Sequence, residues 1–241
     1  NYALLVAEGP SVGSLVPAPL LRGMTRGAVV RFEEITRCPP EVQDCLLAPL
    51  SDRVLAIPEL AGDDAMAFAV DGFNLIATAN TRDRGVNEMS SALKRRFNFE
   101  TVFPIGDLDT ELALVATEAG ALLRRSGVTA PPRMDLLEVL VTTFRELRGG
   151  RTVEGTEVDR MAAAMSTAEA VSVAHAVGLR GWYLRREPGS AADLVSCLAG
   201  TAAKDSADDL ARLRRYLEQQ VAHRPGGQWP ALYRARHQLP G

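Results

Sequence analysis

Apolar runs and helical patterns alternate through the first hundred residues of the chain. Strands are predicted at four apolar runs, residues 1–7, 28–32, 72–80 and 99–105. Helices are predicted between them, at residues 18–27, 40–52 and 87–97. The run at 72–80 is apolar nearly throughout, which is typical of a central strand covered on both faces. Strands that alternate with helices indicate an α/β unit with a mostly parallel sheet.

From about Gly106 onward the pattern is helical only. Apolar residues recur at helical spacing, which predicts helices at residues 107–127, 134–150, 166–179, 191–203, 206–224 and 229–238. Ser166 is followed three residues later by Glu169, the arrangement of a capping box at a helix N-terminus. Residues 151–158 are rich in turn formers and predict a small hairpin. The sequence therefore predicts two domains, an α/β core at 1–106 and an all-α domain at 107–241.

Composition and charge are those of an ordinary globular protein. Hydrophobic residues make up 46% and charged residues 24% of the 241 positions. The net charge of -3 argues against a nucleic-acid binder, whose domain is normally strongly basic. The three cysteines form no paired or metal-binding pattern, so we expect a reducing, cytoplasmic location. No apolar run approaches the roughly 20 residues that a membrane span requires.

Polar side chains follow the two best predicted strands of the first domain. Glu33 and Glu34 come directly after the strand at 28–32, and Asn80 ends the strand at 72–80. In an open parallel sheet, ligands bind beyond the carboxyl ends of the strands. If these strands are neighbours, two carboxylates and an amide meet at one edge. Arg95 and Arg96 then end the next predicted helix. Carboxylates for a metal ion, a polar group that orients water, and an arginine are the parts that phosphoryl transfer requires.

Each of these features also has a simpler structural explanation. A pair of glutamates before a helix is favoured by the helix dipole. An asparagine after a strand is commonly a turn former, and a pair of arginines is commonly exposed surface charge. The order of the three features within one α/β unit, more than any single one, favours a phosphate-handling site.

Two long segments resemble the Walker B, sensor 1 and arginine-finger segments of AAA+ ATPases. They are VVRFEEITRCPPEVQDCLLAPLSDR (29–53) and FNLIATANTRDRGVNEMSSALKRRF (73–97). The similarity is to the MoxR-like, dynein-related branch and covers about residues 9–105. TFRELRGG, STAEAVSV and YLEQQ in the second half are more weakly similar to the helical lid of a MoxR-type subgroup. The resemblance implies an AAA+ parallel-sheet nucleotide-binding domain followed by an all-α lid, with ATP and Mg²⁺ as cofactors.

The resemblance also implies roles for individual residues. Glu33 stands at the Walker B aspartate position, which supports Mg²⁺ through water, and Glu34 stands at the catalytic glutamate that activates water. Asn80 matches sensor 1. Arg96 is the first choice for the arginine finger that acts on a neighbouring subunit's nucleotide, and Arg95 is the alternate.

The sequence departs from the family pattern at the phosphate-binding loop and at the lid. No GxxxxGK[ST] motif occurs in the 241 residues, so we expect the loop and its preceding strand to lie upstream of Asn1. The first Walker B position is Glu33 instead of aspartate. Related families carry a sensor 2 arginine where this chain has Ala168, and Arg180 or Arg185 are weak substitutes.

The function that the resemblance implies is ATP hydrolysis in a ring, expected to be a hexamer, which remodels or matures a partner protein. A separately encoded protein with a von Willebrand factor A domain is the partner that the resemblance suggests. Two alternatives stay open. One is an AAA+-like interaction module that lacks a functional phosphate loop and does not hydrolyse ATP. The other is a metal-dependent hydrolase that uses Glu33 and Glu34 without nucleotide, which the lack of nearby histidine ligands disfavours.

Overall fold

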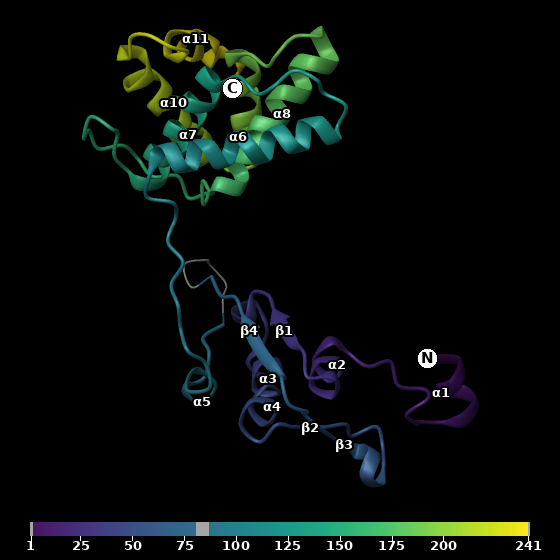
Figure 1. The fold of residues 1–241 in the computed structure, drawn as a ribbon. Helices are drawn as coiled ribbons and strands as arrows, with labels where there is room; N and C mark the ends of the chain where they lie inside the picture. Colours follow the sequence, from purple (N-terminus) through teal and green to yellow (C-terminus); the bar gives the residue numbers. More distant parts are fainter. Residues whose placement is uncertain (1, 81–86, 241) are drawn as a thin grey trace. The chain divides into compact units, whose positions relative to one another are not determined.

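The computed structural model describes residues 2–80 and 87–240, shown as a ribbon in Figure 1. The chain forms two compact units, one ending at Thr101 and the other beginning at Val102. The first unit contains both strands and helices, and the second contains helices and short turns.

The first unit is organised by two parallel strands. β1 (Val29–Phe32) pairs with β4 (Asn74–Ala77), and Val30 lies opposite Leu75 in the register. Both of these side chains are buried in the apolar core of the unit, together with the side chains of Met24, Ile35, Leu46, Phe73, Met89 and Leu93. The condition on which the sequence analysis depended, that these two strands are parallel neighbours, is met, and their carboxyl ends therefore share one edge.

One face of this strand pair is more exposed than the sequence predicted. Val29 of β1 is 60% exposed and Ile76 of β4 is 56% exposed, so β4 is not covered on both faces by the described residues. Val30 and Leu75 point to the covered face because side chains alternate along a strand. The sequence pattern shows that both faces of β4 are apolar, but it does not show what covers them.

Helices connect and flank the strands of the first unit. They are α1 (Tyr2–Glu8), α2 (Pro19–Arg26), α3 (Pro40–Asp44), α4 (Leu47–Ser51) and α5 (Ser91–Lys94), with short 3-10 turns at Ile35–Arg37 and Gly62–Ala65. The single helix predicted at 40–52 is two short helices, α3 and α4. The helix predicted at 87–97 is only the four residues of α5, which begins with Ser90 accepting a hydrogen bond from the backbone N–H of Leu93 at 3.2 Å.

Two strand predictions were wrong. Residues 1–7 were predicted as an edge strand, but Tyr2–Glu8 is the helix α1, and its alanine and leucine residues are good helix formers. Residues 99–105 were also predicted as a strand, but they form neither strand nor helix. A strand needs a hydrogen-bonded neighbour, and within residues 2–80 and 87–240 none pairs with this segment.

A hairpin that the sequence analysis did not anticipate forms between β2 (Val54–Ala56) and β3 (Met66–Phe68), which pair in antiparallel fashion. Its strands are three residues long, too short to show the alternating pattern from which strands are predicted.

Two glycines bring the end of α2 close to the start of β4. Gly27 ends α2 in the left-handed conformation (φ 64°), which glycine commonly adopts just after a helix. A Cβ at Gly27 would lie 2.1 Å from the carbonyl oxygen of Asp71, and a Cβ at Gly72 would lie 2.7 Å from the carbonyl oxygen of Gly27. Only glycine allows the two backbones to approach this closely.

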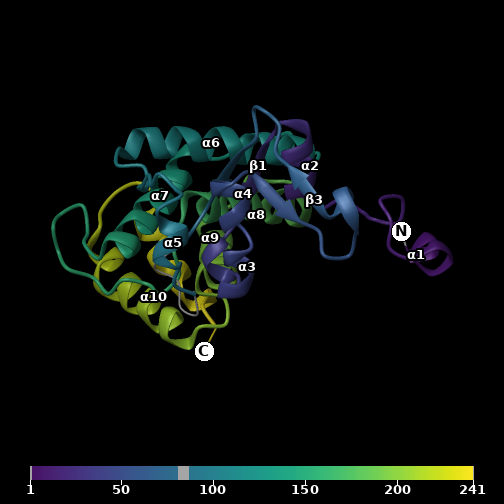
Figure 2. The ribbon, with the colours of Figure 1, turned by 90° about the horizontal axis from the view of Figure 1, so that it is seen from below.

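The second unit is a helical assembly. Its helices are α6 (Leu108–Arg125), α7 (Met134–Gly149), α8 (Thr167–Arg185), α9 (Ala191–Leu198), α10 (Ala207–Gln219) and α11 (Trp229–Arg234). Short turns follow three of them, at Ala199–Ala203, Val221–His223 and Ala235–Gln238. Every helix predicted for this half is present. Figures 1 and 2 show α6 and α8 side by side, in agreement with their packing against each other.

Local signals in the sequence define the ends of these helices. The capping box of Ser166 and Glu169 is present at the start of α8, and Gly150 ends α7 with a φ of 75°. The hairpin predicted at 151–158 is reduced to an antiparallel bridge between Arg151 and Glu157. Phe144 of α7 is completely buried in the core. Among the described residues, no helix is long and apolar enough to cross a membrane.

Candidate functional site

The carboxyl edge of the β1–β4 pair holds the first predicted acidic residue. Glu33 directly follows β1, and its Oε2 accepts a hydrogen bond of 2.5 Å from the hydroxyl of Thr78, which directly follows β4. The other oxygen, Oε1, lies 2.6 Å from the Nε of Arg31. The parallel pairing thus joins two strand ends that are 45 residues apart in sequence.

Glu34 adopts an unusual backbone conformation at this edge. Its φ of 50° lies in the left-handed region, which costs energy for a residue other than glycine. The backbone N–H of Glu34 donates to Thr78 Oγ1 at 3.0 Å, and the N–H of Ile35 donates to the carbonyl oxygen of Thr78 at 2.9 Å. These bonds hold the turn, and the exposed carboxylate of Glu34 lies 3.5 Å from Arg37 Nε.

Thr78 is the residue of this site that the sequence analysis missed. Its hydroxyl donates to Glu33 and accepts from Glu34, so one side chain positions both glutamates. A threonine inside an apolar strand run gives no separate signal, because threonine is common in strands. The one signal in the sequence was the position of Thr78, close to Asn80 at the predicted end of the strand.

Asn80 and the two arginines occupy different positions in the first unit. Asn80 is exposed, three residues beyond the end of β4. Arg96 donates from Nε to Ser51 Oγ and from Nη1 to the carbonyl oxygen of Ala92, both at 2.6 Å. Arg95 is exposed, and although its backbone N–H donates to the carbonyl oxygen of Ser91 at 3.3 Å, its side chain makes no hydrogen bond or ion pair with any residue that the structure describes. The two arginines therefore differ in how firmly their own unit holds them.

The two arginines considered as sensor 2 substitutes share one partner in the helical unit. Arg185 forms an ion pair with the buried Asp193, and Arg180 lies 3.5 Å from the same carboxylate. Burial raises the pKa of Asp193, but the hydrogen bonds from Ser190 and Arg185 outweigh it and keep this pKa below its usual value. Both arginines thus have a structural role at the start of α9.

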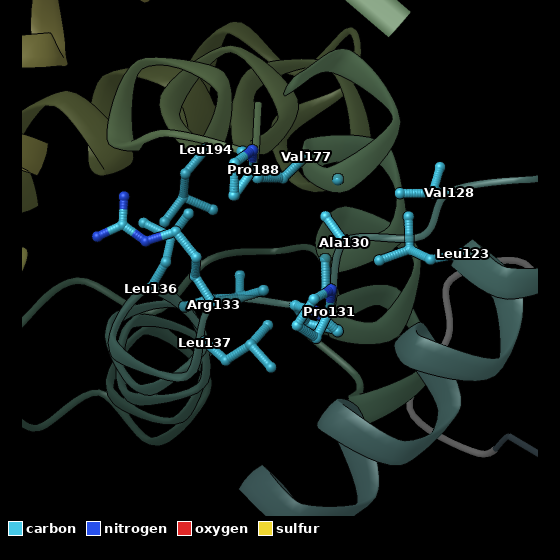
Figure 3. A pocket seen from close by; sticks show the side chains of 15 residues that line it. Leu123, Val128, Ala130, Pro131, Arg133, Leu136, Leu137, Val177, Pro188 and Leu194 are labelled. Carbon is cyan, nitrogen blue, oxygen red and sulfur yellow. The ribbon is translucent and has the colours of Figure 1, made fainter. Parts of the chain in front are cut away.

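The apolar hollow in the helical unit is too small for a nucleotide. Figure 3 shows Leu136 and Leu137 of α7 and Val177 of α8 facing it. Its cavity volume is about 20 Å³, which leaves room for about one water molecule. A second hollow, of about 230 Å³, lies beside α10 and is lined by charged residues such as Asp159 and Arg215, which pair with each other at 2.7 Å. Both hollows are lined by residues of the helical unit alone.

Comparison with known families now identifies the chain. Residues 109–240 match the family described as the YehL-like AAA+ ATPase C-terminal domain, which is more than half of the chain. The chain belongs to the YehL-like AAA+ ATPases. Residues 2–97 match the AAA domain of the dynein-related subfamily, so the AAA+ prediction is confirmed. The parallel β1–β4 pair and the many helices fit an α/β AAA+ fold.

One curated relative matches along the whole chain. The "Uncharacterized protein YehL" of Escherichia coli strain K12 is 59% identical over 240 residues, which is 100% of this chain and 66% of the relative. The chain therefore spans slightly less than two thirds of the length of that relative. No solved structure gives a significant match.

Proposed function

We propose that this protein is a MoxR-like AAA+ ATPase that hydrolyses ATP in a ring assembly in order to remodel or mature a partner protein. The observation that carries the proposal is the β1–β4 edge, where Glu33 and Glu34 follow one strand and are tied by Thr78 to the next. The family membership supports the same activity. The helical unit takes the role of the AAA+ lid in this proposal.

The residues at the edge fit Mg²⁺ and a nucleotide. Mg²⁺ takes oxygen ligands and is commonly held by one or two carboxylates, water and substrate phosphates. Glu33 and Glu34 are exposed and supply such oxygens. The described residues contain no group of three or more acidic, histidine or cysteine side chains that could enclose a metal ion. A site completed by water and phosphate therefore fits better than a metal centre built by protein alone.

Each side chain has one task in the proposed reaction. Glu33 would hold Mg²⁺ through water; ATP would supply the phosphoryl group, and Mg²⁺ would neutralise its charge. Glu34 takes the proton of the attacking water, and Asn80 orients that water. Arg96, or Arg95 as the alternate, stabilises the transferred group from a neighbouring subunit. A partner with a von Willebrand factor A domain remains an expectation from the family resemblance.

Replacing the proposed base gives the direct test. In the full-length gene product, Glu34→Gln removes the proton acceptor at nearly constant volume, and we expect ATP turnover to fall by a factor of about 100 to 10,000. The variant should still bind ATP. Glu41→Gln is the matched control, because Glu41 is an exposed glutamate of α3 close by in sequence, and it should leave turnover unchanged.

The possible outcomes separate the proposal from its alternatives. Equal turnover in wild type and Glu34→Gln would refute the assigned base. A wild-type protein that binds no ATP, measured with a fluorescent ATP analogue, would support the interaction module. Hydrolysis that needs a metal ion but no nucleotide would support the metal-dependent hydrolase.

A further inference from the structure

Gln43 of α3 is a polar side chain in the interior of the first unit. The residue is 1% exposed. Its Nε2 donates a hydrogen bond of 3.0 Å to the carbonyl oxygen of Cys38. Its Oε1 accepts no hydrogen bond from any residue that the structure describes. Turning the amide round would bring Oε1 against the carbonyl oxygen of Cys38, so the hydrogen bond to Cys38 fixes the orientation of the amide.

The unpaired oxygen of Gln43 costs free energy of folding, because a buried acceptor has lost its hydrogen bonds to water. Methionine has a similar size and shape, and it would fill the same space without an unpaired oxygen. What glutamine supplies beyond methionine is the N–H donor that reaches Cys38. Residues that break a local rule in this way are expected chiefly at functional sites.

Cys38 closes the turn that begins at Glu34. The backbone N–H of Cys38 donates to the carbonyl oxygen of Ile35 at 3.2 Å, and that of Arg37 donates to the carbonyl oxygen of Glu34 at 2.8 Å. Glu34 has a φ of 50°, and its side chain is 64% exposed. Because little packs around an exposed side chain, the direction of the Glu34 carboxylate depends mainly on the backbone of this turn.

Three attachments hold this turn against the rest of the first unit. Thr78 holds its start through the two hydrogen bonds described for the candidate site. The N–H of Asn87 donates to the carbonyl oxygen of Thr36, in the middle of the turn, at 2.7 Å. Gln43 holds the end of the turn at Cys38. The bond from Gln43 comes from a buried side chain, where water does not compete for the donor, so it restrains the turn firmly.

We propose that Gln43 is a positioning residue, whose amide holds Cys38 so that the turn keeps the carboxylate of Glu34 in one direction. The inference rests on the proposed function in one respect, the role of Glu34 as the base. The restraint of the turn does not depend on ATP hydrolysis. Without the amide, the carboxylate is correctly placed for a smaller fraction of the time, so ATP binds as before and the chemical step slows.

The substitution Gln43→Met removes the amide at nearly constant volume. In the full-length gene product, we expect kcat for ATP to fall by a factor of about 10 to 100, while KM changes by less than about twofold. Leu46→Met is the control, since Leu46 is a buried apolar neighbour in sequence, and it should keep the wild-type kcat. A wild-type kcat in Gln43→Met would overturn the inference.

Combining Gln43→Met with Glu34→Gln shows whether Gln43 acts through Glu34. In the Glu34→Gln background, Gln43→Met should lower the residual turnover by less than about twofold, because the group that it positions is gone. An equal fold loss in both backgrounds would show an independent role and overturn the inference. Wild-type turnover in Glu34→Gln alone would refute the proposed function instead, and hydrogen exchange then decides about the restraint.

Amide hydrogen exchange, followed by NMR, tests the restraint without ATP. The backbone N–H groups of Arg37 and Cys38 close the turn, and we expect them to exchange at least about tenfold faster in Gln43→Met than in wild type. Leu46→Met should leave both rates unchanged. Equal rates in Gln43→Met and wild type would overturn the inference. Gln43→Leu, which also lacks the amide, takes the place of Gln43→Met in every comparison if that variant does not fold.

Discussion

The buried carboxylate of Glu111 offers the sharpest test of how the helical unit is held together. Glu111 lies in the first turn of α6, and its two oxygens accept hydrogen bonds from Arg145, Arg148 and Thr167 at 2.8 to 3.2 Å. Arg148 also donates to the carbonyl oxygen of Met165 at 2.8 Å. One carboxylate thus connects α6, α7 and the start of α8.

The substitution Glu111→Gln removes the negative charge and leaves the side-chain volume nearly unchanged. Removing one partner from a buried ion pair costs about 3 to 5 kcal/mol, because the other partner is left uncompensated. Arg145 and Arg148 keep 25% and 17% exposure, so we place the loss in the free energy of unfolding at the lower end, about 3 kcal/mol. The unfolding entropy is about 2.1 cal/mol/K per residue, over a unit of roughly 140 residues. Dividing the lost free energy by this entropy predicts that the midpoint temperature of thermal unfolding falls by about 10 °C.

Differential scanning calorimetry at pH 7 measures this change, because it can follow the unfolding of the helical unit as a separate transition. Glu118→Gln is the matched control, since Glu118 is an exposed glutamate of the same helix. We expect its midpoint to stay within about 1 °C of wild type, since exposed substitutions change stability little. A fall of less than 2 °C in Glu111→Gln would refute the reasoning that this network stabilises the unit.

The pH dependence gives an independent check on the same residue. Burial raises the pKa of Glu111, but the hydrogen bonds from Arg148, Thr167 and Arg145 outweigh it and lower this pKa below its usual value of 4.5. A lowered pKa in the folded state means that the stabilisation is complete above the unfolded-state pKa and is lost as the pH falls through the folded-state pKa. The difference in midpoint between wild type and Glu111→Gln should therefore be constant near pH 7 and shrink below about pH 4.

Two further predictions concern the β1–β4 edge and the arginines. Arg96→Ala should be inactive alone but regain ATP turnover when mixed with Glu34→Gln subunits, whereas rescue of Arg95→Ala instead would assign the finger to the alternate residue. No rescue of either variant would argue against an arginine supplied by a neighbouring subunit. Thr78→Val should lower turnover about tenfold, because it removes a hydrogen bond to the charged Glu33 worth about 1.5 kcal/mol. Thr78→Ser keeps the hydroxyl and should stay close to wild type, so equal loss in both would contradict the role of the hydroxyl.

Much of the helical unit could be predicted from the sequence because its signals are local. The spacing of apolar residues predicted all of its helices, and Ser166 with Glu169 marked the start of α8. Gly150 ends α7 in the left-handed conformation that glycine adopts readily. Each of these signals acts over one or two helical turns, within the range that a single stretch of sequence specifies.

Strands were predicted less well because a strand depends on a partner. Two apolar runs predicted β1 and β4, but that these strands are parallel neighbours was only a condition until the structure showed the pairing. Residues 99–105 have a similar apolar character but form no strand, since the described residues offer them no neighbour. The hairpin of β2 and β3 was missed, because its three-residue strands carry too short a pattern.

The sequence by itself determined that the chain has an α/β part and a helical part, and that Glu33 and Glu34 follow one strand while Asn80 lies at the end of another apolar run. The tertiary structure alone decided that Thr78 connects the two strand ends and that Glu111 accepts hydrogen bonds from Arg145 and Arg148. The physical reason is distance along the chain. Helix ends and strand ends are set by neighbouring residues, whereas these hydrogen bonds join residues more than 30 positions apart and exist only once the elements have packed.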